Sequence, residues 1–574
     1  MIINGFRNLR SRRGSALLLV LVLGSASLLI VFGILSWSHS NTNFAARNNQ
    51  YYRTLAAAEA ATEKVAARVG NDYQNFGVAL VTANLDSYRT SVPTPEENSY
   101  WSEYQFMDEN GVVNQISVDW LPINDSSILS SRYRGLRGSA YDMRIFCKAR
   151  ELNSPFPIVA RNRQNLELSV VTVFQYAVFY NVDLEINPSP AMTITGPVHC
   201  NANIYLHPST SLLFEDEVTA VGQVFLTRKP GDPSSSGAIG TITYADKPPT
   251  TGFMSLNLPV GTTNTPSAVH QIIEIPPWTE SPSSVLGQQR YYNQADMVIL
   301  VTDSAVTVTS GSINGFATTI PTNQGKFFIN TNVSFFNARE NKNVRCTDID
   351  VDKLRQWSDT NDVLRPVLVQ KDVRAIYIAD NRSQTSSTEP GIRLINGAWL
   401  PPKGLTVATL HPLYIKGNYN VSTNGTPVNL GTNDTSGTVP ASIIADAITI
   451  LSGNWNDANS SLALSSRIAT STTVNCAILA GNVATTSASY SGGLENFPRF
   501  LEDWSGQTFT YNGSMVAMFD SRYATAPWSG AGASVSIYSP PIRNWSFDAN
   551  FNDLAKIPPA SPQVRTLIRG AWAD

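Results

Sequence analysis

The feature that most constrains the fold of this chain is an apolar run near its N-terminus. Residues 15–35 contain no charged side chain, and as a helix the run is about 30 Å long, which matches the hydrocarbon core of a bilayer. Arginines precede the run at Arg7, Arg10, Arg12 and Arg13, and basic residues on one flank mark the cytoplasmic side of a membrane helix. The run predicts one membrane span with most of the chain on the extracytoplasmic side.

Three kinds of N-terminal segment compete to explain this run. A cleavable secretory signal has a core of about 7 to 15 residues followed by a site of small residues. Here the core is longer, and Trp37-Ser38-His39 and further helix-forming residues follow it. A plain membrane anchor fits the length but does not explain why the basic leader ends at Gly14, directly against the apolar run.

The third kind fits both features. The basic leader 1–14, Gly14 at its end and the apolar helix resemble the class III leader of type IV pilin-like proteins. The resemblance implies that a prepilin peptidase cuts after Gly14 and that the new N-terminal residue, Ser15, is N-methylated. It also implies that the helix holds the subunit in the inner membrane until the subunit joins a filament.

One position departs from the pilin pattern. Most pilins carry a glutamate at the fifth residue of the mature chain, where this sequence has Leu19. An unpaired charge in the apolar phase is costly, so a subunit with no neighbour to neutralise gains by losing it. The departure resembles the K-type pseudopilin of type II secretion and some PilX-type minor pilins. This resemblance implies a minor subunit, with a position at the tip favoured.

The helix is expected to continue beyond the membrane. Residues 48–69 are rich in alanine, with apolar residues three to four positions apart, and the segment 51–61 loosely resembles the long helix of PilX-type and K-type proteins. A long helix over residues 15–70, first hydrophobic and then amphipathic, is therefore predicted. A surface amphipathic helix is the alternative for the second half.

The remainder of the chain indicates an α+β fold that is mainly β. Strand-forming segments over residues 100–180 predict a small antiparallel sheet, so that residues 71–180 form a pilin-like α/β head. Short strands separated by turn residues then predict a β-rich body over 181–440 and a β-rich C-terminal region with a short helix over 441–574. A partial parallel β-helix is favoured for the body, and a β-sandwich is the alternative.

Three local predictions belong to this C-terminal half. Residues 350–361 predict a capped short helix, and residues 494–504 predict another. Asn512-Gly513 predicts a hairpin or a tight turn within residues 509–519. The aromatic and proline-rich tail, residues 543–572, is expected to pack onto the body.

Composition excludes some functions. The net charge is −3 and 15% of residues are charged, which gives no electrostatic argument for nucleic-acid binding. Cys147, Cys200, Cys346 and Cys476 are widely separated, so zinc spacing is absent, and the sequence does not decide between disulfides and buried thiols. His199 and His207, eight residues apart, are expected to be structural. We predict no cofactor and no metal site.

Two groups of acidic residues are candidate binding or catalytic sites. Asp348, Asp350 and Asp352 alternate and would share one face of an extended strand, which suits either calcium or a solvated strand edge before a helix. Glu495, Glu502 and Asp503 lie among aromatic residues, which suits either a glycosidase-like carboxylate pair or a structural helix. The structural alternative is favoured for both groups, so the chain is predicted not to be an enzyme.

The sequence therefore predicts a non-enzymatic minor pilin-like subunit of a type IV pilus or a type II secretion pseudopilus. Its expected partners are other pilin or pseudopilin subunits, the prepilin peptidase and the inner membrane, with no nucleic acid. The alternative is a surface-displayed adhesin or glycan-binding β-helix protein with a membrane anchor. A membrane-anchored enzyme that acts on polysaccharide is a third hypothesis, on fold analogy alone.

Overall fold

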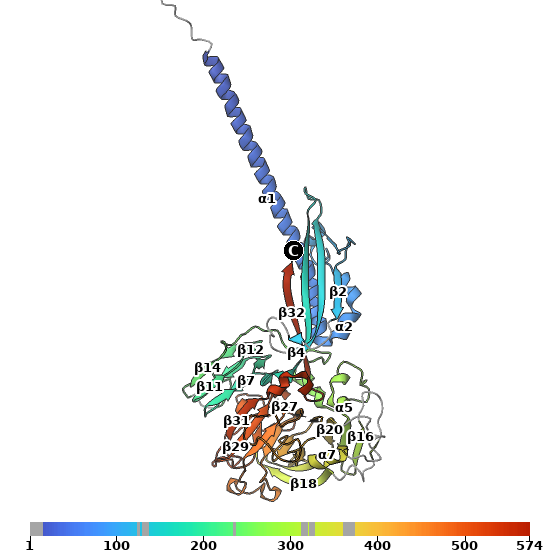
Figure 1. Ribbon diagram of the computed structural model, residues 1–574, viewed down its shortest axis with the longest axis vertical. Helices are drawn as coiled ribbons and strands as arrows, with labels where there is room; N and C mark the ends of the chain where they lie inside the picture. The colour runs from blue at the N-terminus through green and yellow to red at the C-terminus, as the bar shows by residue number, and fades with distance from the viewer. Residues whose placement is uncertain are drawn as a thin grey trace, which may run out of the picture.

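A long helix, an antiparallel sheet and a larger region of stacked strands follow one another in the computed structural model (Figure 1). The structure describes residues 15–122, 127–128, 137–233, 237–310, 319–320, 328–359 and 373–573. The leader 1–14, with the predicted cleavage residue Gly14, lies outside the described residues. The fold is mainly β with a long N-terminal helix and several sheets, as predicted.

Helix α1 spans Ser15–Phe76, a length of about 93 Å. Its side chains are exposed as far as Asn49, and from Gln50 onward a residue is buried every third or fourth position. This change marks the point at which α1 meets the rest of the molecule. The predicted long helix is confirmed, and it continues six residues beyond residue 70.

The second half of α1 packs on an antiparallel sheet, here called the head sheet. Its two long central strands pair with each other over thirteen positions, from Gly138↔Val171 to Arg150↔Val159. Short helices and three short strands surround them, and α1 contacts both central strands. The elements are α2 Val78–Ala83, α3 Leu85–Arg89, β1 Tyr104–Met107, β2 Ser117–Pro122, β3 Ser127–Ile128, β4 Arg137–Glu151 and β5 Val159–Thr172.

The last strand of the head sheet comes from the end of the chain. Strand β32, Gln563–Ala573, pairs with β5 in antiparallel register, with Leu567 opposite Leu168. Residues 173–562 therefore lie between two neighbouring strands of one sheet, and we call them the coiled region. The tail, residues 543–572, was expected to pack onto the body. Its first part does so, because β31 Ile542–Phe547 pairs with β29 Thr508–Gly513 and Phe551 is buried in a core. β32 instead completes the head sheet, which was not predicted because a long-range strand pair leaves no local sequence signal.

The coiled region begins with coils that repeat every twenty residues. Val178 pairs with Val198 and Val198 with Val218, all in parallel strands. A second parallel ladder shares the twenty-residue step, from Leu184 to Ile204 to Val224. A third takes one such step, from Met192 to Leu212, and then pairs Leu212 with Ile242. All strand pairs in these coils are parallel, which does not match the predicted alternative of an antiparallel sandwich. The strands are β6 Val178–Tyr180, β7 Leu184–Ile186, β8 Met192–Ile194, β9 Val198–Cys200, β10 Ile204–Leu206, β11 Ser211–Phe214, β12 Val218–Ala220, β13 Val224–Phe225 and β14 Thr241–Tyr244.

After these coils the chain crosses to the opposite end of the same sheet and returns. The crossing segment, residues 245–296, contains α4 Pro266–His270 and α5 Tyr291–Gln294. The sheet then runs through six strands and ends beside β6, where Met515 pairs with Val178. These strands are, in order, β15 Met297–Val301, β20 Ala375–Asp380, β22 Leu405–Thr409, β24 Ala441–Ala445, β27 Ala477–Asn482 and β30 Met515–Asp520. The first strand of the coiled region therefore pairs with the last strand of its largest sheet.

Two further sheets complete the returning half, and hydrophobic cores join all parts. One core fills the coils, one lies under α1, and one holds Val171 and Val564 of the head sheet against Leu256 of the crossing segment. The remaining elements are β16 Val306–Ser310, β17 Thr319–Ile320, β18 Ile329–Asn337, β19 Lys342–Asp350, α7 Val351–Asp359, β21 Thr388–Ile395, β23 Leu413–Lys416, β25 Ile448–Leu451, β26 Thr472–Asn475 and β28 Arg499–Phe500.

Asn512 and Gly513 lie at a corner of a coil. The strands on its two sides, β29 and β30, pair with different neighbours in parallel register and lie in different sheets. The hairpin alternative was therefore wrong. Asn512 and Gly513 are the last paired residues of β29, and the corner follows at Ser514. Gly513 fits here because a Cβ would lie 2.0 Å from the carbonyl oxygen of Cys476 on the coil below.

Candidate functional site

The exposed first half of α1 is the part of the molecule that most needs a partner. Helix α1 is long and apolar enough to cross a membrane, and none of the side chains in its most apolar window is buried. Leu18, Leu29 and Phe32 have exposed fractions of 65%, 71% and 71%. Such a continuous apolar surface is not stable in water and must meet lipid or other apolar helices.

The exposed part of α1 is longer than a membrane requires. Residues 15–49 give a helix of about 52 Å, and a bilayer core takes about 30 Å of it. Figure 1 shows this part of α1 projecting away from the head sheet and the coiled region. Trp37 and Phe44 lie beyond the apolar run and are also exposed, at 69% and 65%. A second stretch of helix is thus left bare between the membrane length and the head sheet.

Ser15, the predicted first residue of the mature chain, and Leu19, where most pilins have a glutamate, lie at the N-terminal end of this helix. Ser15 is the first residue of α1, while Gly14 lies outside the described residues. Leu19 is exposed, at 61%. At Gly24 and Gly33 a Cβ would meet no atom within 4 Å, so close approach of another helix is unobstructed there in the described chain.

The second half of α1 is fixed to the head sheet by packing and hydrogen bonds. Ala57, Ala58 and Ala61 are buried against the sheet, and they are three of the five alanines of the predicted 51–61 motif. The buried Asn162 side chain donates to Thr62 Oγ1 at 2.8 Å. At the entry point Gln50 Nε2 donates to the Phe156 carbonyl at 2.8 Å. The bare and docked parts of α1 therefore form one continuous rod held by the sheet.

Arg565 of β32 holds the end of α1, a role that the sequence analysis did not identify. Its Nη1 donates to the Tyr73 carbonyl at 2.9 Å, and burial lowers the pKa of its guanidinium to about 10. Gly77 has φ of +81°, and a Cβ there would lie 2.3 Å from Arg565 Nη2. A glycine directly after a long helix is the one local sign of this contact.

The candidate calcium ligands Asp348, Asp350 and Asp352 make separate contacts and do not point to one site. Asp348 forms a buried ion pair with Arg393, with Arg393 Nη2 at 2.8 Å. Asp350 accepts from the Lys353 amide at 3.1 Å and caps α7, which confirms the helix predicted for residues 350–361. Asp352 lies inside α7 and pairs with Arg355. The three carboxylates therefore do not share a strand face, because the strand ends at Asp350.

The acids weighed as a glycosidase pair serve separate structural contacts. Glu502 accepts from the Ser452 amide and hydroxyl at 2.6 and 2.7 Å, and Glu495 accepts from the Asn187 amide at 3.3 Å. Burial raises the pKa of both carboxyls to about 7. Asp503 accepts from Ser505, which lowers its pKa. The helix predicted for 494–504 is wrong, since only a 3-10 turn, Leu494–Asn496, precedes β28.

The cysteines and histidines also lie in structural positions. All four cysteines are buried and unpaired, and burial raises the pKa of Cys147 and Cys200 to about 12. His199 lies within hydrogen-bond distance of Thr219 Oγ1, at 2.8 Å, and burial lowers its pKa to about 4. Among the described residues, no group of three His, Cys, Asp or Glu side chains could hold a metal ion.

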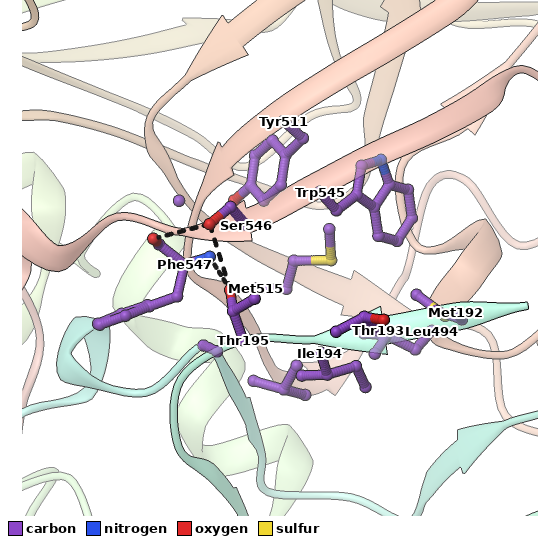
Figure 2. Close-up of a pocket in the computed structure, with 13 residues that line it drawn as sticks. Met192, Thr193, Ile194, Thr195, Leu494, Tyr511, Met515, Trp545, Ser546 and Phe547 are labelled. Atoms are coloured by element: carbon purple, nitrogen blue, oxygen red, sulfur yellow. Dashed lines mark hydrogen bonds between the residues drawn. The ribbon is translucent and has the colours of Figure 1, made fainter. Parts of the chain in front are cut away.

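A small cavity lies where the first and last coils meet (Figure 2). Ile194 of β8, Met515 of β30 and Trp545 of β31 line it, and the Phe547 amide donates to Thr195 Oγ1 at 2.7 Å across the junction. Its volume is about 30 Å³, room for a water molecule or two and far below the ~300 Å³ of a small ligand pocket. This cavity is a packing gap rather than a binding site.

Comparison with known proteins does not assign the chain to a family. No protein-family model matches the chain, and no curated protein matches it. One solved structure that resembles it is the competence-associated pilin ComZ from Thermus thermophilus, at 10% sequence identity and a TM-score of 0.24. The alignment covers 91% of this chain and 97% of that chain. At this identity and score the likeness does not establish a relationship.

Proposed function

We propose that the chain is a non-enzymatic minor pilin-like subunit of a type IV pilus or type II secretion pseudopilus. One observation carries the proposal: a single helix joins a bare, membrane-length apolar segment to a docked segment on an antiparallel sheet. Force applied to the apolar half is transmitted to the sheet, because α1 has no break between Ser15 and Phe76. Extraction from the membrane into a filament needs such a rod.

Processing after Gly14 is part of the proposal. We expect the mature chain to begin at Ser15 with a methylated amine, since the resemblance places the cleavage site there. Mass spectrometry of the N-terminal peptide from cells with and without the prepilin peptidase tests this. An intact Met1, or a start beyond Leu35, would contradict it.

The size of the coiled region favours a position at the filament tip. Residues 173–562 lie at the end of the head sheet away from the N-terminus of α1 (Figure 1), where they would crowd neighbouring subunits in a shaft. Leu19 agrees with this position, because a tip subunit has no neighbour ahead of it whose amine needs a carboxylate. Quantitative mass spectrometry of sheared filaments should find about one copy per filament, and a copy number like that of the major subunit would exclude the tip.

A further inference from the structure

A cleft of about 790 Å³ lies between the head sheet and the coiled region. It is within the ~300 to 1,000 Å³ range of small-molecule sites. One wall is formed by β4 and β5 and carries Tyr141. The crossing segment forms another wall, and the residues that lead into β32 form a third. The cleft is therefore present only because the coiled region is inserted between two strands of the head sheet.

The lining of the cleft mixes polar and aliphatic side chains and carries no charge. None of its fourteen residues is Asp, Glu, Lys, Arg or His. Four are glutamines, which offer both donors and acceptors, and three carry aliphatic hydroxyls. The glutamines are Gln288, Gln289, Gln294 and Gln563.

Several of these side chains are held in place before any ligand binds. Gln288 Nε2 donates to the Ser283 carbonyl at 2.8 Å, and Gln294 Nε2 donates to the Gln288 carbonyl at 3.0 Å. These bonds fix the direction of both amide oxygens. The Tyr141 ring is stacked on Trp120 with centroids 5.2 Å apart, so its orientation is fixed as well. Polar groups and an aromatic ring that are already fixed in position reduce the entropy lost on binding.

We propose that this cleft binds a short neutral oligosaccharide. Sugar hydroxyls match a lining of amides and hydroxyls, and the apolar face of a pyranose ring packs on an aromatic side chain. A nucleic acid needs cationic side chains, which the lining lacks. A peptide bound by strand addition needs a free strand edge. Here β4 and β5 are each paired on both sides, and the edge strand β32 is bridged to Asn257 at Arg565, two residues from Gln563.

Calorimetric titration of the full chain tests the proposal, in micelles of lauryldimethylamine oxide, a detergent without a sugar head group. The probes are cellotetraose, maltotetraose and tetra-N-acetylchitotetraose, with tetragalacturonate as the charged control. We expect saturable binding of at least one neutral probe and none of tetragalacturonate at the same concentrations. No binding of any neutral probe, or equal binding of tetragalacturonate, overturns the proposal.

Two variants locate the site, one that spans two walls and one on the crossing segment alone. The double variant Q289A/Q563A removes two amides, and S283W, at an exposed position, narrows the cleft. Each should weaken binding at least tenfold, while Q223A, an exposed glutamine of the coils outside the cleft, should bind like the wild type. Circular dichroism spectra and melting temperatures confirm that each variant is folded. A loss smaller than tenfold in both cleft variants, or an equal loss in Q223A, overturns the assignment.

Discussion

At the scale of single residues, the coiled region depends on buried charged groups that the folded structure keeps neutral or paired. Burial raises the pKa of Glu495 to about 7 at the junction of the first and last coils, where its carboxyl accepts from the Asn187 backbone amide. Arg393 is instead kept charged, because it pairs with Asp348 and Asp457. Substitution of Glu495 should therefore change how stability depends on pH, whereas substitution of Arg393 should lower stability itself.

The raised pKa of the Glu495 carboxyl makes the stability of the fold depend on pH. Its pKa rises from 4.5 to about 7 on folding, so the folded state holds the proton more tightly than the unfolded state. Stability should therefore fall as pH rises from about 4.5 to 7, by up to about 3 kcal/mol from this group. Glu495→Gln cannot ionise, so denaturant unfolding at pH 5 and pH 8 should show a smaller difference in the variant. An unchanged difference would contradict this assignment.

The buried pair of Arg393 and Asp348 behaves differently. Arg393→Ala leaves a buried carboxylate without its cation, which costs about 3–5 kcal/mol, and the melting temperature should fall clearly. The matched control is Arg345→Ala, which removes an exposed partner of Asp303 and should leave the melting temperature nearly unchanged. Equal melting temperatures for the two variants would show that burial of the pair is unimportant.

At the scale of elements, the joint between α1 and β32 decides whether the helix is held along its docked length. Leu567 lies in the core under α1, and Arg569 pairs with Glu63 of α1 at 2.8 Å. The chain end is thereby attached to its beginning, across more than five hundred residues of sequence. Figure 1 shows the end of β32 beside α1.

Loss of the apolar contact should loosen α1 more than loss of the ion pair. Leu567→Asp puts a charge into the core and should expose residues 60–76 to protease. Arg569→Ala removes only a partly exposed ion pair, with side chains 45% and 35% exposed, and should leave the cleavage pattern as in the wild type. Limited proteolysis with peptide mapping measures this. Equal protection in Leu567→Asp would contradict the role of β32.

Elements with a local signal were predictable, and those fixed by distant pairs were not. The apolar run and the alanine spacing predicted α1, and Asp350 before α7 predicted that helix. Short strands in this region were predicted, but their twenty-residue period was missed because the stacked positions hold different aliphatic residues, such as Leu184, Ile204 and Val224. In the returning half, the loops between strands differ in length, so the sequence shows no constant period there. β32 was missed because its partner lies far away in sequence.

The candidate functional residues also fall into those that a local sequence pattern predicts and those that only the fold brings together. Ser15, Leu19 and the buried alanines follow from local pattern. The cleft between the head sheet and the coiled region could not be predicted, because glutamines at 288–294 and 563 meet only through the insertion topology. Arg565 was missed for the same reason, since Tyr73 and Gly77 lie near the opposite end of the chain.

At the scale of the whole molecule, orientation across the membrane is the property on which the proposed function depends. Basic residues precede the apolar run, so residues after 35 should lie outside the cytoplasm. The buried cysteines allow a direct test, because burial and a raised thiol pKa make all four unreactive. The wild-type chain should thus give almost no labelling with a membrane-impermeant maleimide.

A cysteine placed just beyond the apolar run should then report which side it occupies. Ser40 is exposed on the bare part of α1, so Ser40→Cys should be labelled in intact spheroplasts. Its counterpart Ser11→Cys lies in the basic leader and should be labelled only after lysis. Both variants are measured in cells without prepilin peptidase, so that cleavage does not remove Ser11. Labelling of Ser11→Cys in intact spheroplasts, with Ser40→Cys protected, would reverse the orientation, place the coiled region in the cytoplasm and exclude a filament subunit.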